Sequence, residues 1–362
     1  MRLVHALGTG VSGVGVLGAR GDRLSRLKRL DLPIAPGFAV ATTAWRLTRL
    51  AGPADVDATL RSQTSAALAA LELESGHRID DAKHPLLLSV TPSGRDGSGR
   101  AAPIRDVGLS DTTLEGLAAR AGATFAWGAY SDLLQDVCLR VHGLDAESVD
   151  RAAPADAPAA VQVDGLNGLL RACGRSWPQR GRAQLAAILT ALIGTADEPT
   201  ALVVQARTIG AADEWSGVGT VYTREPTTGK VVPVGRFLPG GDWGRPDAPV
   251  APEMDLDELR RHIPSADDDL RRGLAGIEAI QRDMCEVDFT IERGRLWFDD
   301  ARPGRRSALA AVRIAADLVA AGLIDVDTAR ERVPPSALED LRRMKSPSSE
   351  RALARVLSWA GA

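Results

Sequence analysis

One stretch of the chain decides the interpretation of its fold: Glu286-Val287-Asp288-Phe289-Thr290-Ile291-Glu292-Arg293-Gly294. Apolar and polar residues alternate from Val287 to Ile291, as they do in a strand with one buried face. Arg293-Gly294 has the composition of a two-residue turn, and Leu296 to Asp299 is predicted to return as the partner strand. The stretch therefore predicts an antiparallel hairpin with one polar face.

Acidic residues gather on that polar face. With the turn at Arg293-Gly294, Glu292 faces Arg295, Thr290 faces Trp297, and Asp288 faces Asp299, while Glu286 shares the face of Asp288. Like charges placed opposite each other in a sheet are destabilising, so three carboxylates on one face predict a compensating cation. Mg²⁺ bound with a nucleotide is the natural candidate, because hard cations take carboxylate and phosphate oxygens. An exposed acidic face whose charges are solvated is the alternative.

An arginine follows the hairpin closely. Arg302 lies just beyond the predicted return strand, where its guanidinium is placed to contact a phosphate directly.

A second stretch is rich in glycine and turn residues: Ser216-Gly217-Val218-Gly219-Thr220-Val221-Tyr222-Thr223-Arg224-Glu225-Pro226-Thr227-Thr228-Gly229. Residues 218–237 are predicted to form two strands around the turn at 226–229. Glycine inside a strand is usual where other groups approach the backbone closely, and this is the structural explanation for Gly217 and Gly219.

The composition is that of an ordinary soluble globular protein. A chain of 362 residues with a 44% apolar share can hold one large domain or two to three small ones. The net charge of −3 offers no basic field to attract nucleic acid or an anionic membrane, and no apolar run is long enough for a membrane span. The three cysteines match no zinc or redox spacing. These features predict a cytoplasmic protein with reduced thiols.

The order of predicted elements is mixed, without regular alternation of strands and helices, which favours an α+β architecture of two lobes around a cleft. A Gly-rich loop is expected at 8–21, followed by a helix over 22–30. The predicted division is a first lobe at 1–115, a helical region at 116–200 with an Ala/Pro linker near 152–160, a second lobe at 201–305 and a helical tail at 306–362. Strands are expected at 2–6, 38–40, 86–90 and 201–206, and further helices at 43–74, 185–193 and 307–321.

Several motifs follow one another in a fixed order. They are Leu17-Gly18-Ala19-Arg20-Gly21-Asp22-Arg23-Leu24, Leu30-Asp31-Leu32-Pro33-Ile34-Ala35-Pro36-Gly37-Phe38, Phe125-Ala126-Trp127 with Tyr130, Ser216 to Gly229, Asp288 to Gly294, Ala311-Val312-Arg313-Ile314-Ala315, and Gly322-Leu323-Ile324. In this order they resemble the nucleotide-binding domain of the pyruvate phosphate dikinase family. The resemblance implies a two-lobed ATP-grasp fold with a helical insertion and a helical C-terminal tail.

The resemblance also implies a function and a set of residues. It implies that the chain binds ATP with Mg²⁺ and moves phosphate to a separate acceptor, either a phosphohistidine-domain protein or a small molecule. Arg20 and Arg302 would be the catalytic residues. The nucleotide would be held by Arg20, Arg95, Gln205, Glu286, Asp288, Asp300 and Arg302, and Mg²⁺ by Glu286, Asp288 and Asp300.

The sequence departs from the family pattern at functional positions. Arg20 stands in place of the family's loop lysine, and Val90-Thr91-Pro92-Ser93-Gly94 lacks the arginine of the family's Val-Arg-Ser-Gly, although Arg95 and Arg100 lie in the same loop. Gly235-Arg236-Phe237 reverses an acidic position, and Asp300-Ala301-Arg302 replaces Gln-Thr-Arg. None of the five histidines has the Thr-Ser-His setting of the family's phosphorylated histidine. We therefore do not expect a complete dikinase, and a degenerate, non-catalytic relative that acts as a binding or regulatory module is the alternative.

Overall fold

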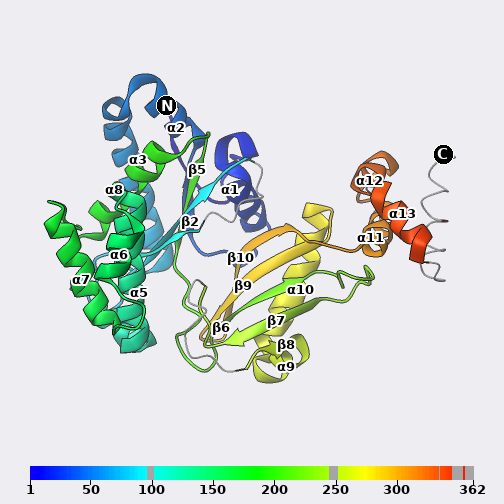
Figure 1. Cartoon of the computed structure of the whole chain (residues 1–362). Coiled ribbons are helices and arrows are strands. Elements are labelled where there is room, and N and C mark those ends of the chain that lie inside the picture. Colours follow the sequence, from blue (N-terminus) through cyan, green and yellow to red (C-terminus); the bar gives the residue numbers. More distant parts are fainter. Residues whose placement is uncertain (96–101, 244–251, 334, 345–353, 355–362) are drawn as a thin grey trace. The chain divides into compact units, whose positions relative to one another are not determined.

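The chain folds into two compact units, residues 1–212 and 213–362. The computed structural model describes residues 1–95, 102–243, 252–333, 335–344 and 354. Each unit is built on one five-stranded antiparallel sheet, with helices packed against it (Figure 1). This confirms the predicted α+β class.

The sheet of unit 1 has the strand order β1-β2-β5-β3-β4. Its central strand β5 and the neighbouring β2 are almost entirely buried, because helix α1 packs against β5, β3 and β2 and other helices add to the core. Strands were expected at 2–6, 38–40, 86–90 and 201–206, whereas the strand at 104–107 was not predicted. The strands are β1 (Val4–Ala6), β2 (Gly37–Val40), β3 (Leu88–Ser93), β4 (Ile104–Val107) and β5 (Ala201–Ala206).

Helices make up most of the rest of unit 1. The residues between α6 and α7 are the Ala/Pro-rich segment, which is a short connection inside this unit. Tyr130 of α5 is fully buried, and its hydroxyl donates a hydrogen bond to Asp111, so it packs in the core. The helices are α1 (Val14–Lys28), α2 (Thr42–Ala51), α3 (Pro53–Ser75), α4 (Leu114–Ala121), α5 (Ala123–Asp136), the π-helical turn η1 (Val137–Val141), α6 (Ala146–Ala152), α7 (Ala159–Ala172) and α8 (Gly181–Thr195).

Helix α1 begins earlier than the sequence predicts. It starts at Val14, inside the expected loop over 8–21, and is kinked at Gly18, which has φ 68° and ψ 171°. A Cβ atom at Gly18 would lie 2.0 Å from the carbonyl oxygen of Ser93, so this position requires glycine. The amide of Ala19 donates to the carbonyl of Gly94 at 2.7 Å, and Ser93 Oγ accepts from the amide of Arg20 at 3.1 Å. These contacts with the end of β3 compensate the kink, and the local sequence gives no sign of them.

The sheet of unit 2 has the strand order β10-β9-β6-β7-β8. Its inner face is covered by α10, which packs against β9 and β10. The strands are β6 (Gly217–Tyr222), β7 (Val234–Pro239), β8 (Met254–Asp255), β9 (Cys285–Glu292) and β10 (Arg295–Pro303). The helices are α9 (Leu256–His262), α10 (Pro264–Gln281), α11 (Ala308–Ala320), α12 (Val326–Arg332) and α13 (Pro335–Met344).

The hairpin of β9 and β10 has the predicted turn but not the whole predicted register. Arg293 and Gly294 have φ values of 53° and 77°, as a tight two-residue hairpin turn requires. Near the turn, Glu292 pairs with Arg295 and Thr290 with Trp297, as expected.

A bulge then changes the register. It lies between Phe298 and Asp300, so Asp288 pairs with Asp300 and not with Asp299. The prediction that Asp288 faces Asp299 was wrong, because it assumed a regular ladder. In that regular ladder Arg302 would have faced Cys285 on the buried side of the sheet; the extra residue brings it opposite Glu286 on the polar side.

Gly217 and Gly219 make room for aromatic rings. A Cβ atom at Gly217 would lie 2.4 Å from Cζ of Phe237, and one at Gly219 would lie 2.3 Å from Cζ of Phe289. Both phenylalanines are fully buried, and their rings stack with centroids 6.2 Å apart. The close-approach explanation of these glycines is therefore confirmed: they let two core rings pack against the backbone of β6.

Replacing Gly219 by alanine should lower the free energy of unfolding by about 1–3 kcal/mol, because the new methyl group overlaps the Phe289 ring. Urea denaturation followed by circular dichroism measures this. Gly276→Ala is the matched control, since a Cβ atom in the middle of α10 meets nothing within 4 Å and alanine favours a helix. Equal stability of the two variants would contradict the packing role.

Candidate functional site

The polar face of the unit 2 sheet is assembled across all five strands. One row of paired residues runs Arg302, Glu286, Tyr222 and Val234 from β10 to β7. The neighbouring row runs Asp300, Asp288, Thr220 and Arg236, and ends at Asp255 on β8. Directly paired residues of antiparallel strands point to the same side, so these rows form one continuous surface, on which every residue except Val234 carries a charged or hydroxyl group.

Arg302 bridges the two acids of β9. Its Nη1 donates to Asp288 Oδ2 at 2.5 Å, and its Nη2 donates to Glu286 Oε1 at 2.5 Å and to Asp288 Oδ1 at 3.3 Å. The three side chains are only 14–17% exposed. Burial by itself lowers the pKa of Arg302, but the hydrogen bonds and charges of Asp288 and Glu286 outweigh burial, so the pKa rises above its ordinary value. The guanidinium is therefore a permanent positive charge held by two carboxylates.

The compensating cation of the acidic face is thus supplied by the hairpin itself. The sequence predicted that the acids need a cation, and Arg302 meets that need in the structure. Asp299 does not join the pair: its Oδ2 accepts from Thr290 Oγ1 at 2.6 Å and from the indole Nε1 of Trp243 at 2.9 Å.

Asp300 lies in register with Asp288 and is buried, and its Oδ1 accepts from the amide of Ala301 at 2.9 Å. Within the described ranges, no group of three or more His, Cys, Asp or Glu side chains is placed to hold a metal ion. The side chains as they stand do not form a ready Mg²⁺ site, because a guanidinium lies between the two acids that would bind the metal.

Two hydroxyl groups beside the acids were missed by the sequence analysis. Thr220 Oγ1 donates to Asp288 Oδ1 at 2.8 Å, and Tyr222 is paired with Glu286 across β6 and β9. Burial, together with the negative charge of Glu286, raises the pKa of Tyr222. Thr220 and Tyr222 alternate with buried residues along β6, a pattern visible in the sequence. Only the pairing of β6 with β9 shows that Thr220 lies beside Asp288 and Tyr222 beside Glu286.

A hollow of about 470 Å³ adjoins the acids on the same face. It lies over β6 and β7, and its floor includes Val218, Thr220 and Tyr222. Trp243, whose ring is fixed by its hydrogen bond to Asp299, forms part of the wall. Its volume falls in the range of small-molecule pockets, which are mostly apolar with a few placed polar groups.

The predicted site residues of unit 1 are Arg20, Arg95 and Gln205. Arg20 follows the Gly18 kink, and its Nη2 donates to Oε1 of Gln205 on β5 at 3.4 Å. Gln205 is buried, and its amide nitrogen donates to the carbonyl of Ala35 at 3.4 Å. The structure therefore brings Arg20 and Gln205 together. Arg95 is exposed and follows β3, next to residues 96–101, which lie outside the described part of the chain.

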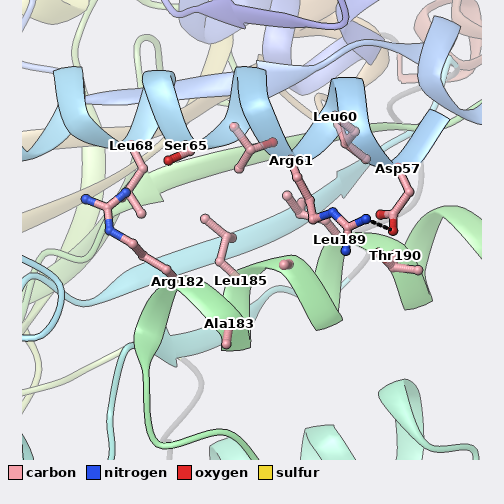
Figure 2. A pocket seen from close by; sticks show the side chains of 12 residues that line it. Asp57, Leu60, Arg61, Ser65, Leu68, Arg182, Ala183, Leu185, Leu189 and Thr190 are labelled. Carbon is pink, nitrogen blue, oxygen red and sulfur yellow. Dashed lines mark ion pairs between the residues drawn. The ribbon is translucent and has the colours of Figure 1, made fainter.

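A hollow in unit 1 contains none of the predicted site residues. It has a volume of about 420 Å³ and lies between α3 and α8 (Figure 2). Leucine side chains from both helices line its middle, and Arg61 and Arg182 stand toward its two ends (Figure 2). Both arginines have carboxylate partners, Asp57 for Arg61 and Glu72 for Arg182.

Comparison with known proteins finds pyruvate, phosphate dikinases among the relatives of this chain. No protein-family model matches the chain. Its curated homologues are pyruvate, phosphate dikinases. The chain is 28% identical over 363 residues to "Pyruvate, phosphate dikinase 1, chloroplastic" of Arabidopsis thaliana, a match that covers 90% of this chain and 37% of the plant protein. It is also 28% identical to "Pyruvate, phosphate dikinase 2" of Oryza sativa subsp. japonica, covering 92% of this chain and 41% of that protein.

The match to "Pyruvate, phosphate dikinase 2" of Zea mays is similar, with 28% identity over 90% of this chain and 40% of that protein. The chain thus spans about two fifths of the length of these relatives. Among the residues that the structure describes, no helix is both long and apolar enough to span a bilayer.

Asp288→Asn should lower the free energy of unfolding by about 1–3 kcal/mol, because Arg302 loses a charged partner in a largely buried place. Chemical denaturation at neutral pH measures the loss. Asp327→Asn is the control: that carboxylate is 87% exposed and pairs with Arg330, so its loss should change stability by less than about 0.5 kcal/mol. A stabilising effect of Asp288→Asn would contradict this prediction. It would mean that the repulsion between Glu286 and Asp288 outweighs their attraction to Arg302.

Proposed function

We propose that this chain is a nucleotide-binding, phosphotransferase-like domain with an ATP-grasp fold, which binds Mg-ATP and passes phosphate to a separate acceptor. The observation that carries the proposal is the cluster of Arg302, Glu286 and Asp288 on the polar face of unit 2, at positions where the sequence resembles the dikinase family. The two antiparallel sheets and the similarity to dikinases over 90% of the chain support it.

Arg302 and Arg20 are the proposed phosphate-binding residues. Arginine suits this role because its planar fork donates two parallel hydrogen bonds to phosphate oxygens. Gln205 supports Arg20 within unit 1, and Arg95 is a further candidate on the loop after β3. Phosphoryl transfer depends mainly on positioning and on neutralising charge, so cations of this kind can serve the reaction without a covalent role.

Mg²⁺ is proposed to arrive with ATP, and Glu286, Asp288 and Asp300 are its proposed protein ligands. When bound, the metal would neutralise phosphate charge. The hollow over β6 and β7 offers room for the rest of the ligand on the same face.

The second candidate function is a non-catalytic binding or regulatory module. It is favoured by the segment Val90-Thr91-Pro92-Ser93-Gly94, which lacks the family's phosphate-binding arginine. Loss of one such charge-stabilising group typically costs about 10²–10³ in rate. Such a module would not transfer phosphate from ATP, whether or not it binds Mg-ATP. The acceptor is proposed to be either a phosphohistidine-domain protein or a small molecule, and incubation with ³²P-ATP and each acceptor separates the two functions.

Mg-ATP should raise the melting temperature above that measured with Mg²⁺ alone, because a ligand at 100 times its Kd adds about 2.7 kcal/mol to folded-state stability. Differential scanning fluorimetry measures the shift.

Arg20→Met should weaken Mg-ATP binding about tenfold or more, since a hydrogen bond to a charged group contributes roughly 1.5–3 kcal/mol.

Arg151→Met is the control for that variant. Arg151 is also in unit 1, but it is 69% exposed and pairs with Glu147 on the same helix, so binding should not change. An unmoved melting temperature at millimolar Mg-ATP would contradict nucleotide binding. If Arg20→Met and Arg151→Met weakened Mg-ATP binding equally, a role of Arg20 in binding the nucleotide would be contradicted.

A further inference from the structure

The acid pair of unit 2 already has a cation. Arg302 makes three hydrogen bonds to Glu286 and Asp288, and these use oxygens that a metal ion would need. Asp288 Oδ1 also accepts from Thr220, so three donors surround this carboxylate. A free divalent cation would have to displace a guanidinium that is only 16% exposed, and both cations cannot lie between the same two carboxylates.

A polyphosphate changes this balance, because its oxygens offer Arg302 other charged partners. A guanidinium pairs as well with phosphate as with carboxylate, in the same two-pronged geometry. If Arg302 moves to a phosphate, Glu286 and Asp288 are left as two adjacent negative charges, which favours a divalent cation.

We propose that Arg302 is the resident cation of the Glu286–Asp288 pair, so that free divalent metal ions are excluded and only a polyphosphate ligand exchanges the guanidinium for the metal. The proposal rests on the proposed nucleotide-binding function. It goes further in assigning an order: the metal reaches the two acids together with the phosphate chain and not before it. Glu286 and Asp288 can then hold a metal ion only after Arg302 has moved to the phosphate.

The same face explains how the acids keep their places during the exchange. Thr220 Oγ1 holds Asp288, and Tyr222 lies opposite Glu286, and both hydroxyls come from β6 and not from the strand that carries Arg302. Departure of the guanidinium therefore leaves each carboxylate beside a hydroxyl of β6.

The test is a titration of the full chain with Mn²⁺, in the absence of nucleotide, with free Mn²⁺ measured by electron paramagnetic resonance. Arg302→Gln should bind one Mn²⁺ with a Kd at least tenfold lower than that of the unchanged chain. The double variant Asp288→Asn with Arg302→Gln should lose this gain, which places the metal on the acid pair.

Arg306→Gln is the matched control, because Arg306 is also in unit 2 and is also held by a carboxylate, that of Asp283. It removes the same charge from the same unit and should leave Mn²⁺ binding unchanged. If circular dichroism shows that Arg302→Gln does not fold, Arg302→Lys takes its place. Its point charge cannot bridge both acids, so it should show a smaller gain in the same direction.

The proposal is overturned if the unchanged chain binds Mn²⁺ as tightly as Arg302→Gln, or if Arg306→Gln gains as much affinity. These outcomes do not depend on nucleotide binding, since no nucleotide is present. The two proposals can therefore fail separately. If the unchanged chain does not bind Mg-ATP but Arg302→Gln gains a Mn²⁺ site, the resident-cation role of Arg302 is supported and the proposed function is contradicted.

Discussion

The arrangement of the candidate site depends on one extra residue in β10. In a regular hairpin from the turn at Arg293-Gly294, Ala301 would face Glu286, and Arg302 would point into the core. The bulge between Phe298 and Asp300 shifts the pairing by one residue and turns Arg302 to the polar side. Because side chains alternate along a strand, a shift of one residue moves every later side chain to the other face. The bulge therefore decides that a guanidinium meets the two acids.

Strand β6 serves both sides of the same sheet. On the buried side, Gly217 and Gly219 leave space for the rings of Phe237 and Phe289. On the polar side, Thr220 and Tyr222 stand next to Asp288 and Glu286. The glycines thus allow tight packing beneath the strand that positions the hydroxyls, and the rigid core fixes the acids from below. The two glycines thus contribute to the candidate site through packing, while Thr220 of the same motif contacts Asp288 directly.

The sequence predicted much of the local structure and less of the site. Alternating residues and the Arg293-Gly294 turn were enough to predict the hairpin, because both are local properties. The bulge was not predictable, since it depends on how β10 fits β9 and the helix beneath. Without the bulge, Arg302 does not reach the acids, and a metal ion was therefore predicted as the cation that balances them. The early start of α1 was missed for a similar reason: the kink at Gly18 is compensated by Ser93 and Gly94, more than seventy residues away in the chain. Thr220 and Trp243 were missed because their partners lie on strands that are distant in sequence.

Arg302 is proposed to leave Glu286 and Asp288 when a polyphosphate ligand binds. A crystal structure of the full chain with Mg²⁺ and a non-hydrolysable ATP analogue tests it most directly. We expect the guanidinium of Arg302 on phosphate oxygens and the metal ion on the carboxylates of Glu286 and Asp288. A bound analogue with Arg302 still bridging both acids would contradict it.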